Sequence, residues 1–121
     1  MNMAKGVLSD KSFAFAVRIV RLSQFLVSEK KEFVLSKQII RSGTSIGAMT
    51  RESEYAESKA DFIHKLSIAL KEANETIYWL DLLKETHFIE DEMYNSLKTD
   101  SEELLKLLIS IIKTTKSNLK K

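Results

Sequence analysis

The sequence contains no cysteine and no proline, and only three glycines in 121 residues. Without cysteine the chain can form neither disulfide bonds nor thiolate metal sites, and thiol catalysis is excluded. Proline and glycine, the residues that most strongly interrupt helices, are absent and rare, respectively. Leu, Ile, Lys, Glu, Ser and Ala dominate instead. This composition favours an all-α protein.

Long apolar runs are also missing. No stretch approaches the ~18 consecutive apolar residues that a membrane span needs, and residues 1–12 lack the apolar core of a signal peptide. We therefore expect a cytoplasmic protein without a membrane partner. A chain of this length supports one hydrophobic core. Residues 1–121 are predicted to form a single domain, with a loose lead-in at 1–9 and a fraying tail at 117–121.

The net charge of +2 is divided unevenly along the chain. Residues 1–60 carry 10 basic and 6 acidic residues, a net charge of +4, whereas residues 61–121 carry 9 basic and 11 acidic residues, a net charge of −2. All four arginines lie in the first half. The first half is therefore the one that would attract phosphate groups.

Hydrophobic periodicity predicts four helices and no strand. The helices are expected from about residue 10 to 28, 34 to 56, 58 to 86, and 90 to the C-terminal lysines. Ser58 and Asp61 have the spacing of a capping box at the start of the third helix. The connectors, such as the charged segment 29–33, are short enough to make successive helices antiparallel neighbours. We expect an all-α, up-down-up-down antiparallel four-helix bundle.

The first predicted helix is apolar on two nearly opposite faces. One face holds Phe13, Ala16, Val17, Val20 and Val27, and the other holds Phe15, Ile19, Leu22 and Leu26. A helix of a bundle normally buries one stripe. A second face implies contact with another subunit, unless the helix is buried unusually deeply in its own bundle. The residues predicted to form an oligomer interface are Phe15, Ile19, Leu22, Leu26, Ile68 and Trp79.

The second predicted helix contains a dense run of small residues, which are Ser42, Gly43, Ser45, Gly47 and Ala48. Small side chains let a neighbouring helix approach closely. Arg41 and Glu52 lie on another stripe of the same helix and are expected to pair with charges on adjoining helices.

Catalytic and metal-binding patterns are sparse. A di-iron bundle site needs a Glu-x-x-His pair on each of two helices, and only Asp61 and His64 approach that spacing. Glu72 and Glu75 could form a carboxylate pair for acid-base chemistry, but we interpret them as partners of Arg41 or a neighbouring lysine. No serine has a histidine at a recognisable motif spacing, and no phosphate-binding glycine loop is present. We expect no catalytic residue, metal or cofactor.

The remaining chemistry is electrostatic. A modest basic patch becomes a large one when an oligomer repeats it, and such a patch attracts phosphate backbones. We find neither an aromatic platform for single strands nor a helix-turn-helix spacing, so base-specific reading is not indicated. For Arg18 and Arg21, a solvated edge or a surface ion pair is the alternative. The residues assigned to nucleic-acid binding are Arg18, Arg21, Lys37, Arg51 and Lys59.

Two segments carry a resemblance to a known family. They are RSGTSIGA at residues 41–48 and SKADFIHKLSIALKEANETIYWLDLL at residues 58–83. Both closely resemble the four-helix-bundle proteins encoded in intervening sequences of bacterial 23S ribosomal RNA genes. The resemblance implies an up-down bundle that assembles as a homopentamer. A related accessory protein of diversity-generating retroelements is a pentameric barrel with a basic surface that binds nucleic acid and its reverse transcriptase.

The resemblance also identifies a structural motif, which comprises Arg41, Ser42, Ser45, Glu52, Asp61, Glu72 and Glu75. The sequence departs from the family at Met49, where asparagine is usual, and at Ser53, where many members have glycine. The resemblance implies no established reaction. Two functions stay open, a non-enzymatic pentameric adaptor for structured RNA or DNA, and a bundle that serves protein partners or scaffolding.

Overall fold

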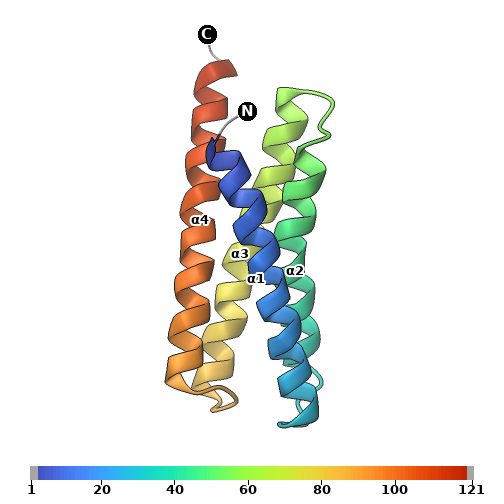
Figure 1. The fold of residues 1–121 in the computed structure, drawn as a ribbon, viewed down its shortest axis with the longest axis vertical. Helices are drawn as coiled ribbons and strands as arrows, with labels where there is room; N and C mark the ends of the chain where they lie inside the picture. The colour runs from blue at the N-terminus through green and yellow to red at the C-terminus, as the bar shows by residue number, and fades with distance from the viewer. Residues whose placement is uncertain (1–2, 120–121) are drawn as a thin grey trace.

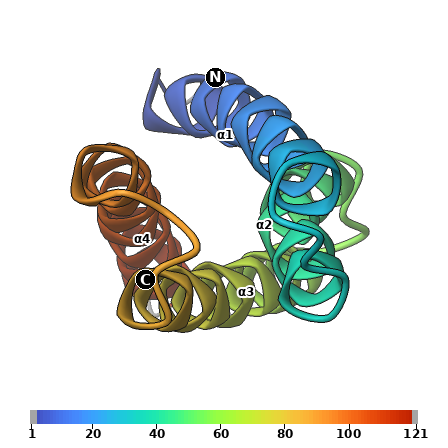
Figure 2. The same ribbon diagram turned by 90° about the horizontal axis from the view of Figure 1, so that it is seen from below.

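A computed structural model describes residues 3–119, and four helices make up most of this range (Figure 1). They are α1 (Met3–Ser28), α2 (Leu35–Ser53), α3 (Lys59–Glu85) and α4 (Asp91–Leu119). Figure 1 shows each helix running back along the one before it. Contacts join α1 to α2, α2 to α3, α3 to α4 and α4 to α1, so the helices surround one common core (Figure 2). The predicted all-α four-helix bundle is confirmed.

The N-terminal end of α1 corrects one prediction. The expected lead-in at residues 1–9 is helical from Met3 onward, and Leu8 is fully buried. Leu8 lies two turns before Phe15 on the same face, so it extends the buried stripe toward the N-terminus. At the other end α4 continues to Leu119, so residues 117–119 of the predicted fraying tail are helical and exposed. Residues 1, 2, 120 and 121 lie outside the described residues.

The apolar residues of α1 also correct the predicted oligomer interface. Its four α1 members lie in the core of the same bundle and are at most 4% exposed; they are Phe15, Ile19, Leu22 and Leu26. The helix does have a second apolar face, but that face is the other one: Phe13 is 59% exposed and Val17 is 38% exposed. The prediction therefore identified two apolar faces correctly, but the face that it assigned to another subunit is buried within this bundle.

Two glycines of α2 explain which face of α1 is buried. A Cβ atom on Gly43 would lie 2.8 Å from both γ carbons of Ile19, and one on Gly47 would lie 3.3 Å from the carbonyl oxygen of Ser12. Because neither glycine has a side chain, the backbone of α2 approaches α1 on the side that carries Ile19. The predicted close approach of a neighbouring helix to the small residues of α2 is confirmed.

The buried face of α2 is rich in hydroxyl groups, which bond to their own helix. Thr50 Oγ1 donates to the carbonyl of Ile46 at 2.8 Å, and Ser53 Oγ donates to the carbonyl of Thr50 at 2.6 Å. Within the described residues, no buried side-chain nitrogen or oxygen lacks a hydrogen-bond partner. These small polar residues therefore allow tight contact between helices without an unsatisfied polar group.

The start of α3 follows the predicted cap with one difference. The backbone N–H of Asp61 donates to Ser58 Oγ at 3.0 Å, as in a capping box. The carboxylate of Asp61 accepts from the backbone N–H of Glu57 at 3.2 Å, one residue before the cap. Asp61 therefore ties the preceding loop to the first turn of α3.

Candidate functional site

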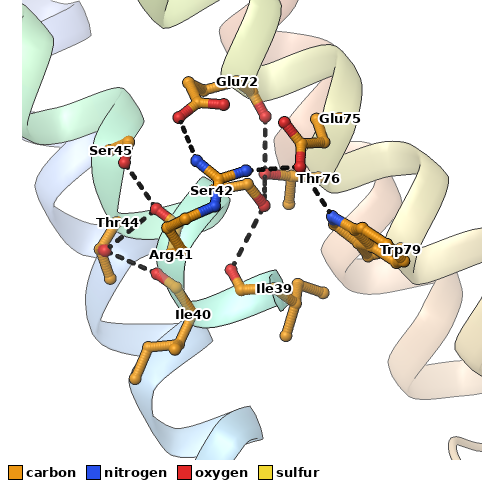
Figure 3. A network of polar contacts seen from close by, with 10 residues as sticks. All are labelled: Ile39, Ile40, Arg41, Ser42, Thr44, Ser45, Glu72, Glu75, Thr76 and Trp79. Atoms are coloured by element: carbon orange, nitrogen blue, oxygen red, sulfur yellow. Dashed lines mark hydrogen bonds and ion pairs between the residues drawn. The ribbon is translucent and has the colours of Figure 1, made fainter. Parts of the chain in front are cut away.

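The motif residues of α2 and α3 form an ion-pair network (Figure 3). Arg41 Nη1 donates to Glu72 Oε2 at 2.8 Å, and Arg41 Nη2 donates to Glu75 Oε1 at 2.5 Å. Trp79 Nε1 also donates to Glu75 Oε1, at 3.2 Å. One guanidinium from α2 thus binds two carboxylates of α3. The structure pairs Glu72 and Glu75 with Arg41, one of the two partners considered from sequence. Glu52, which was expected to pair with a charge on an adjoining helix, pairs with Lys65 of α3 at 3.3 Å.

A buried hydroxyl pair lies beside this network. The oxygens of Ser42 and Thr76 are 2.9 Å apart, and both residues are fully buried. Each hydroxyl also lies within hydrogen-bond distance of a carbonyl of its own helix, that of Ile39 for Ser42 and that of Glu72 for Thr76 (Figure 3). Ser45 Oγ donates to the carbonyl of Arg41 at 2.6 Å and does not reach α3. This part of the motif therefore joins two helices and leaves no reactive group directed at solvent.

The ion pairs shift the pKa values of Arg41 and Glu75. The hydrogen bond from Arg41 lowers the pKa of Glu75, burial opposes this, and the Trp79 N–H lowers it further. Hydrogen bonds to Glu75 and Glu72 in turn raise the pKa of Arg41. A lowered pKa makes the Glu75 carboxylate a weaker base, which suits a structural ion pair and does not suit a general base.

Replacing Arg41 with alanine should lower the free energy of unfolding by about 1 kcal/mol, a small value because the arginine is half exposed. Since the folded-state pKa of Glu75 is depressed, this stabilisation is present above the ordinary glutamate pKa of about 4.3. It is lost as the pH falls through the lower folded-state value. Thermal denaturation of parent and Arg41→Ala should show a difference at pH 7 that narrows toward about pH 3.

Lys37→Ala is the matched control, because Lys37 is exposed on the same helix and has no ion pair within the described residues. It should leave the melting temperature unchanged at both pH values. An Arg41→Ala variant as stable as the parent at neutral pH would contradict the structural role of the network.

A second feature is the apolar surface that α1 presents to solvent, here called the outer face of α1. A groove of about 370 Å³ runs between α1 and α2, and a hollow of about 360 Å³ continues it along α1; both are lined by Phe13 and Ala16. Val17 and Val20 extend the apolar surface along the hollow. The members of the outer face are Phe13, Ala16, Val17 and Val20, with Arg21, Gln24 and Arg51 at its borders.

The predicted nucleic-acid residues do not form one patch. Arg18 Nη1 donates to Asp100 Oδ2 at 2.6 Å and Nη2 to Ser96 Oγ at 3.0 Å, so the alternative of an ion pair holds for Arg18. Arg21 is exposed beside the outer face, and the Arg51 guanidinium lies 5.8 Å from the ring centre of Phe13. Lys37 is in the first turn of α2 and Lys59 begins α3, at opposite ends of the bundle (Figure 1).

Sequence reasoning missed the surface of the α1–α2 connector. It treated residues 29–33 as charged spacer, yet Phe33 is 59% exposed and Val34 is 70% exposed. Lys30 and Lys31 precede this apolar pair directly. The adjacent apolar residues Phe33 and Val34 in a connector could have indicated this exposed surface. The prediction that the chain has no aromatic platform did not consider them.

The other two residues predicted to form the oligomer interface lie on α3 and are partly exposed. Ile68 and Trp79 are both half-buried, and Trp79 packs against the core. The ring of Tyr78, which is exposed, meets Trp79 edge-on at a centroid distance of 5.0 Å. An intersubunit role for Ile68 and Trp79 stays a prediction.

Within residues 3–119, no group of three or more histidine, aspartate or glutamate side chains is arranged to hold a metal ion. Over the same residues, no helix is both long enough and apolar enough to cross a membrane.

Comparison with known proteins identifies a protein family and a similar crystal structure. The family model of the 23S rRNA-intervening sequence protein matches residues 6–110. A crystal structure from Bacteroides thetaiotaomicron, described as a protein of unknown function from the S23 ribosomal protein family, shares 66% sequence identity with this chain. That similarity covers 92% of this chain and 99% of the other, with a TM-score of 0.91. No curated protein matches the chain.

Proposed function

Because the chain belongs to the family of 23S rRNA-intervening sequence proteins, we propose that it is a non-enzymatic, cytoplasmic homo-oligomer that associates with nucleic acid. By its resemblance to that family the oligomer is a pentamer. The observation that carries the proposal is the outer face of α1, because an ordered apolar surface on a helix needs a partner to cover it. Because the ion pairs of the motif have a structural role, we infer that the functional part of the molecule is its surface and not a cleft.

A second copy of the same chain is the partner that fits the outer face. The face is bordered by Arg21 and Arg51 and belongs to the half of the chain with net charge +4. The other half has net charge −2 and exposes Tyr78 on α3 and Ile109 on α4. Both surfaces expose apolar side chains, which would cover one another in the assembly. Two different surfaces that meet head to tail generate a ring when the rotation between subunits closes.

Assembly also supports the nucleic-acid role. Arg21, Lys37, Arg51 and Lys59 are exposed, and none has an ion pair in the described part of the chain. A ring repeats these cations at regular intervals, which raises the positive potential above that of one subunit. Membership in a family named after 23S rRNA connects the chain to an RNA context. We therefore propose that the phosphate backbone of RNA or DNA is the ligand.

The test combines solution mass with binding. Light scattering should give about five times the 13.9 kDa chain mass. Anisotropy of a labelled structured RNA and a labelled duplex DNA should show affinity that falls steeply with salt. The double variant Phe13→Glu with Val17→Glu should be monomeric and bind at least about tenfold more weakly, because the cations are no longer repeated.

Tyr55→Glu is the matched control, since Tyr55 is an exposed aromatic residue outside the outer face. It should leave the mass of the assembly unchanged. A monomeric parent would overturn the assembly. An oligomer that binds neither RNA nor DNA would overturn the nucleic-acid role and favour the alternative, a bundle that serves protein partners or scaffolding.

A further inference from the structure

The α1–α2 connector exposes apolar side chains that folding does not require. Phe33 is 59% exposed and Val34 is 70% exposed, and they are adjacent. Neither side chain belongs to the core or packs against it. Exposing a phenylalanine to water gives up the free energy that its burial would contribute. A side chain of this kind at a defined position is therefore a candidate contact for a ligand.

The connector is held in place by hydrogen bonds on both sides of Phe33. The backbone N–H of Glu32 donates to the carbonyl of Leu26 at 2.9 Å, which fixes the connector to the end of α1. The carboxylate of Glu32 accepts from the backbone N–H groups of Val34 at 3.2 Å and Ser36 at 2.8 Å, at the start of α2. Ser36 Oγ donates back to the carbonyl of Glu32 at 2.9 Å. Phe33 is thus presented by an anchored loop, which lowers the entropy cost of binding a ligand.

The residues that flank Phe33 in the sequence carry mainly positive charge, and the Lys30 ammonium lies 5.8 Å from the ring centre of Phe25. Lys30, Lys31 and Lys37 are exposed and form no ion pair within residues 3–119. Of the two nearby glutamates, Glu32 directs its carboxylate to backbone N–H groups at the positive end of α2. Glu29 remains as the one exposed acidic group between residues 29 and 37. An anionic ligand is therefore favoured at this loop.

A further acidic group lies at the same end of the bundle but on another side. Glu90, Asp91 and Glu92 are exposed at the start of α4, and Figure 2 shows that this turn is separate from the α1–α2 connector. Repulsion from these carboxylates would keep an anionic ligand on the side of α1 and α2.

From this arrangement we propose that the α1–α2 connector binds an unpaired nucleotide, with its base stacked on the ring of Phe33 and the flanking phosphates at Lys30, Lys31 and Lys37. An exposed ring among cations is the arrangement that single-strand binders use. In a duplex both faces of a base are covered by its neighbours, so the ring has access only to unpaired bases. The inference rests on the proposed nucleic-acid function and names the contact within it. Single-stranded RNA and single-stranded DNA share this chemistry.

The experiment measures anisotropy of a labelled 12-nucleotide oligouridine, the corresponding oligodeoxythymidine, and a duplex, each with the full-length protein. Phe33→Ala should weaken binding of the single strands about tenfold, while Phe33→Trp should retain it because the stacking surface remains. Tyr55→Ala is the control, since it removes an exposed aromatic ring from a different loop. Its affinity should equal that of the parent. Binding of both single strands assigns the contact to base and phosphate, and binding of RNA alone adds a contact to the ribose.

The lysines have a separate readout. Because each phosphate contact on a single strand contributes about 0.7 to the slope of log K against log salt, replacing Lys30, Lys31 and Lys37 with glutamine should reduce that slope by about 2. Phe33→Ala should leave the slope unchanged. The salt dependence therefore distinguishes the contribution of stacking on Phe33 from that of the lysine charges.

The outcomes distinguish the inference from the function beneath it. If the parent binds nucleic acid and Phe33→Ala binds equally well, the connector is not the contact, and the proposed function stands. If Phe33→Ala lowers the mass of the assembly, Phe33 is a subunit contact, which also overturns the inference. If the parent binds no nucleic acid of any kind, the proposed function fails first and the inference fails with it.

Discussion

Phe15→Ala should lower the free energy of unfolding by about 3–5 kcal/mol, whereas Phe13→Ala should lower it by less than about 1 kcal/mol at low protein concentration. The two phenylalanines are two residues apart on α1, but Phe15 is 2% exposed in the core and Phe13 is 59% exposed on the outer face. Removing the ring of Phe15 loses its burial and leaves a cavity. Removing the ring of Phe13 loses little within one subunit.

Urea denaturation at several protein concentrations is the measurement. Assembly adds to apparent stability by mass action, so the loss for Phe13→Ala should grow with concentration, while the loss for Phe15→Ala should be present at every concentration. Light scattering on the same samples should show a lower mass for Phe13→Ala only. A Phe15→Ala variant that keeps the parent's stability but dissociates would support the interface predicted from sequence and contradict the burial in the structure.

Gly43→Ala should destabilise the protein by about 1–3 kcal/mol, as extra carbon atoms do in a closely packed core. The new Cβ would lie 2.8 Å from Cγ1 and Cγ2 of Ile19 and 3.2 Å from its Cβ. A β-branched side chain has few alternative rotamers in a helix, so Ile19 cannot turn aside, and the helices must separate. The opposite sign is expected at Gly6, where a Cβ meets nothing within 4 Å. Gly6→Ala in α1 should stabilise by about 0.5–1 kcal/mol.

Thermal denaturation of Gly43→Ala and Gly6→Ala measures the sign of each stability change. The substitution is the same in both variants, so the difference reflects the packing around each glycine. The double variant Ile19→Ala with Gly43→Ala completes a cycle. Since alanine at position 19 removes the two contacts at 2.8 Å and keeps only the one at 3.2 Å, the combined loss should be smaller than the sum of the two single losses. Additive losses would show that Gly43 and Ile19 do not meet in the folded protein.

Local signals in the sequence predicted most of the secondary structure. Ser58 marks the start of α3 because its hydroxyl accepts from the backbone N–H of Asp61, a contact between residues three apart. The end of α1 at Ser28 follows from the charged connector after it. Its start was missed, because Gly6 suggested an interruption, whereas burial of Leu8 extends the helix to Met3. Tertiary contact here outweighed a weak local preference.

Some side-chain contacts of the candidate site could also be predicted from the sequence. Glu72 and Glu75 were interpreted from sequence as partners of Arg41 or a neighbouring lysine, and the structure pairs both with Arg41. The partner of Arg18 was not predicted, since Asp100 is 82 residues away on α4, and periodicity gives no information on such a pairing. Phe33 was overlooked because exposure of a connector residue depends on how the loop folds back, which the hydrogen bonds of Glu32 decide.

The sequence by itself determined that this chain forms four helices, that α2 allows a close neighbour, and that α1 has two apolar faces. Each of these follows from residue types repeated at helical spacing. Only the tertiary structure decided which face of α1 is buried, because both are apolar and periodicity treats them alike. The choice comes from shape: Gly43 and Gly47 leave room for Ile19 and Ser12 on one side of α1. Phe13 consequently faces solvent on the other.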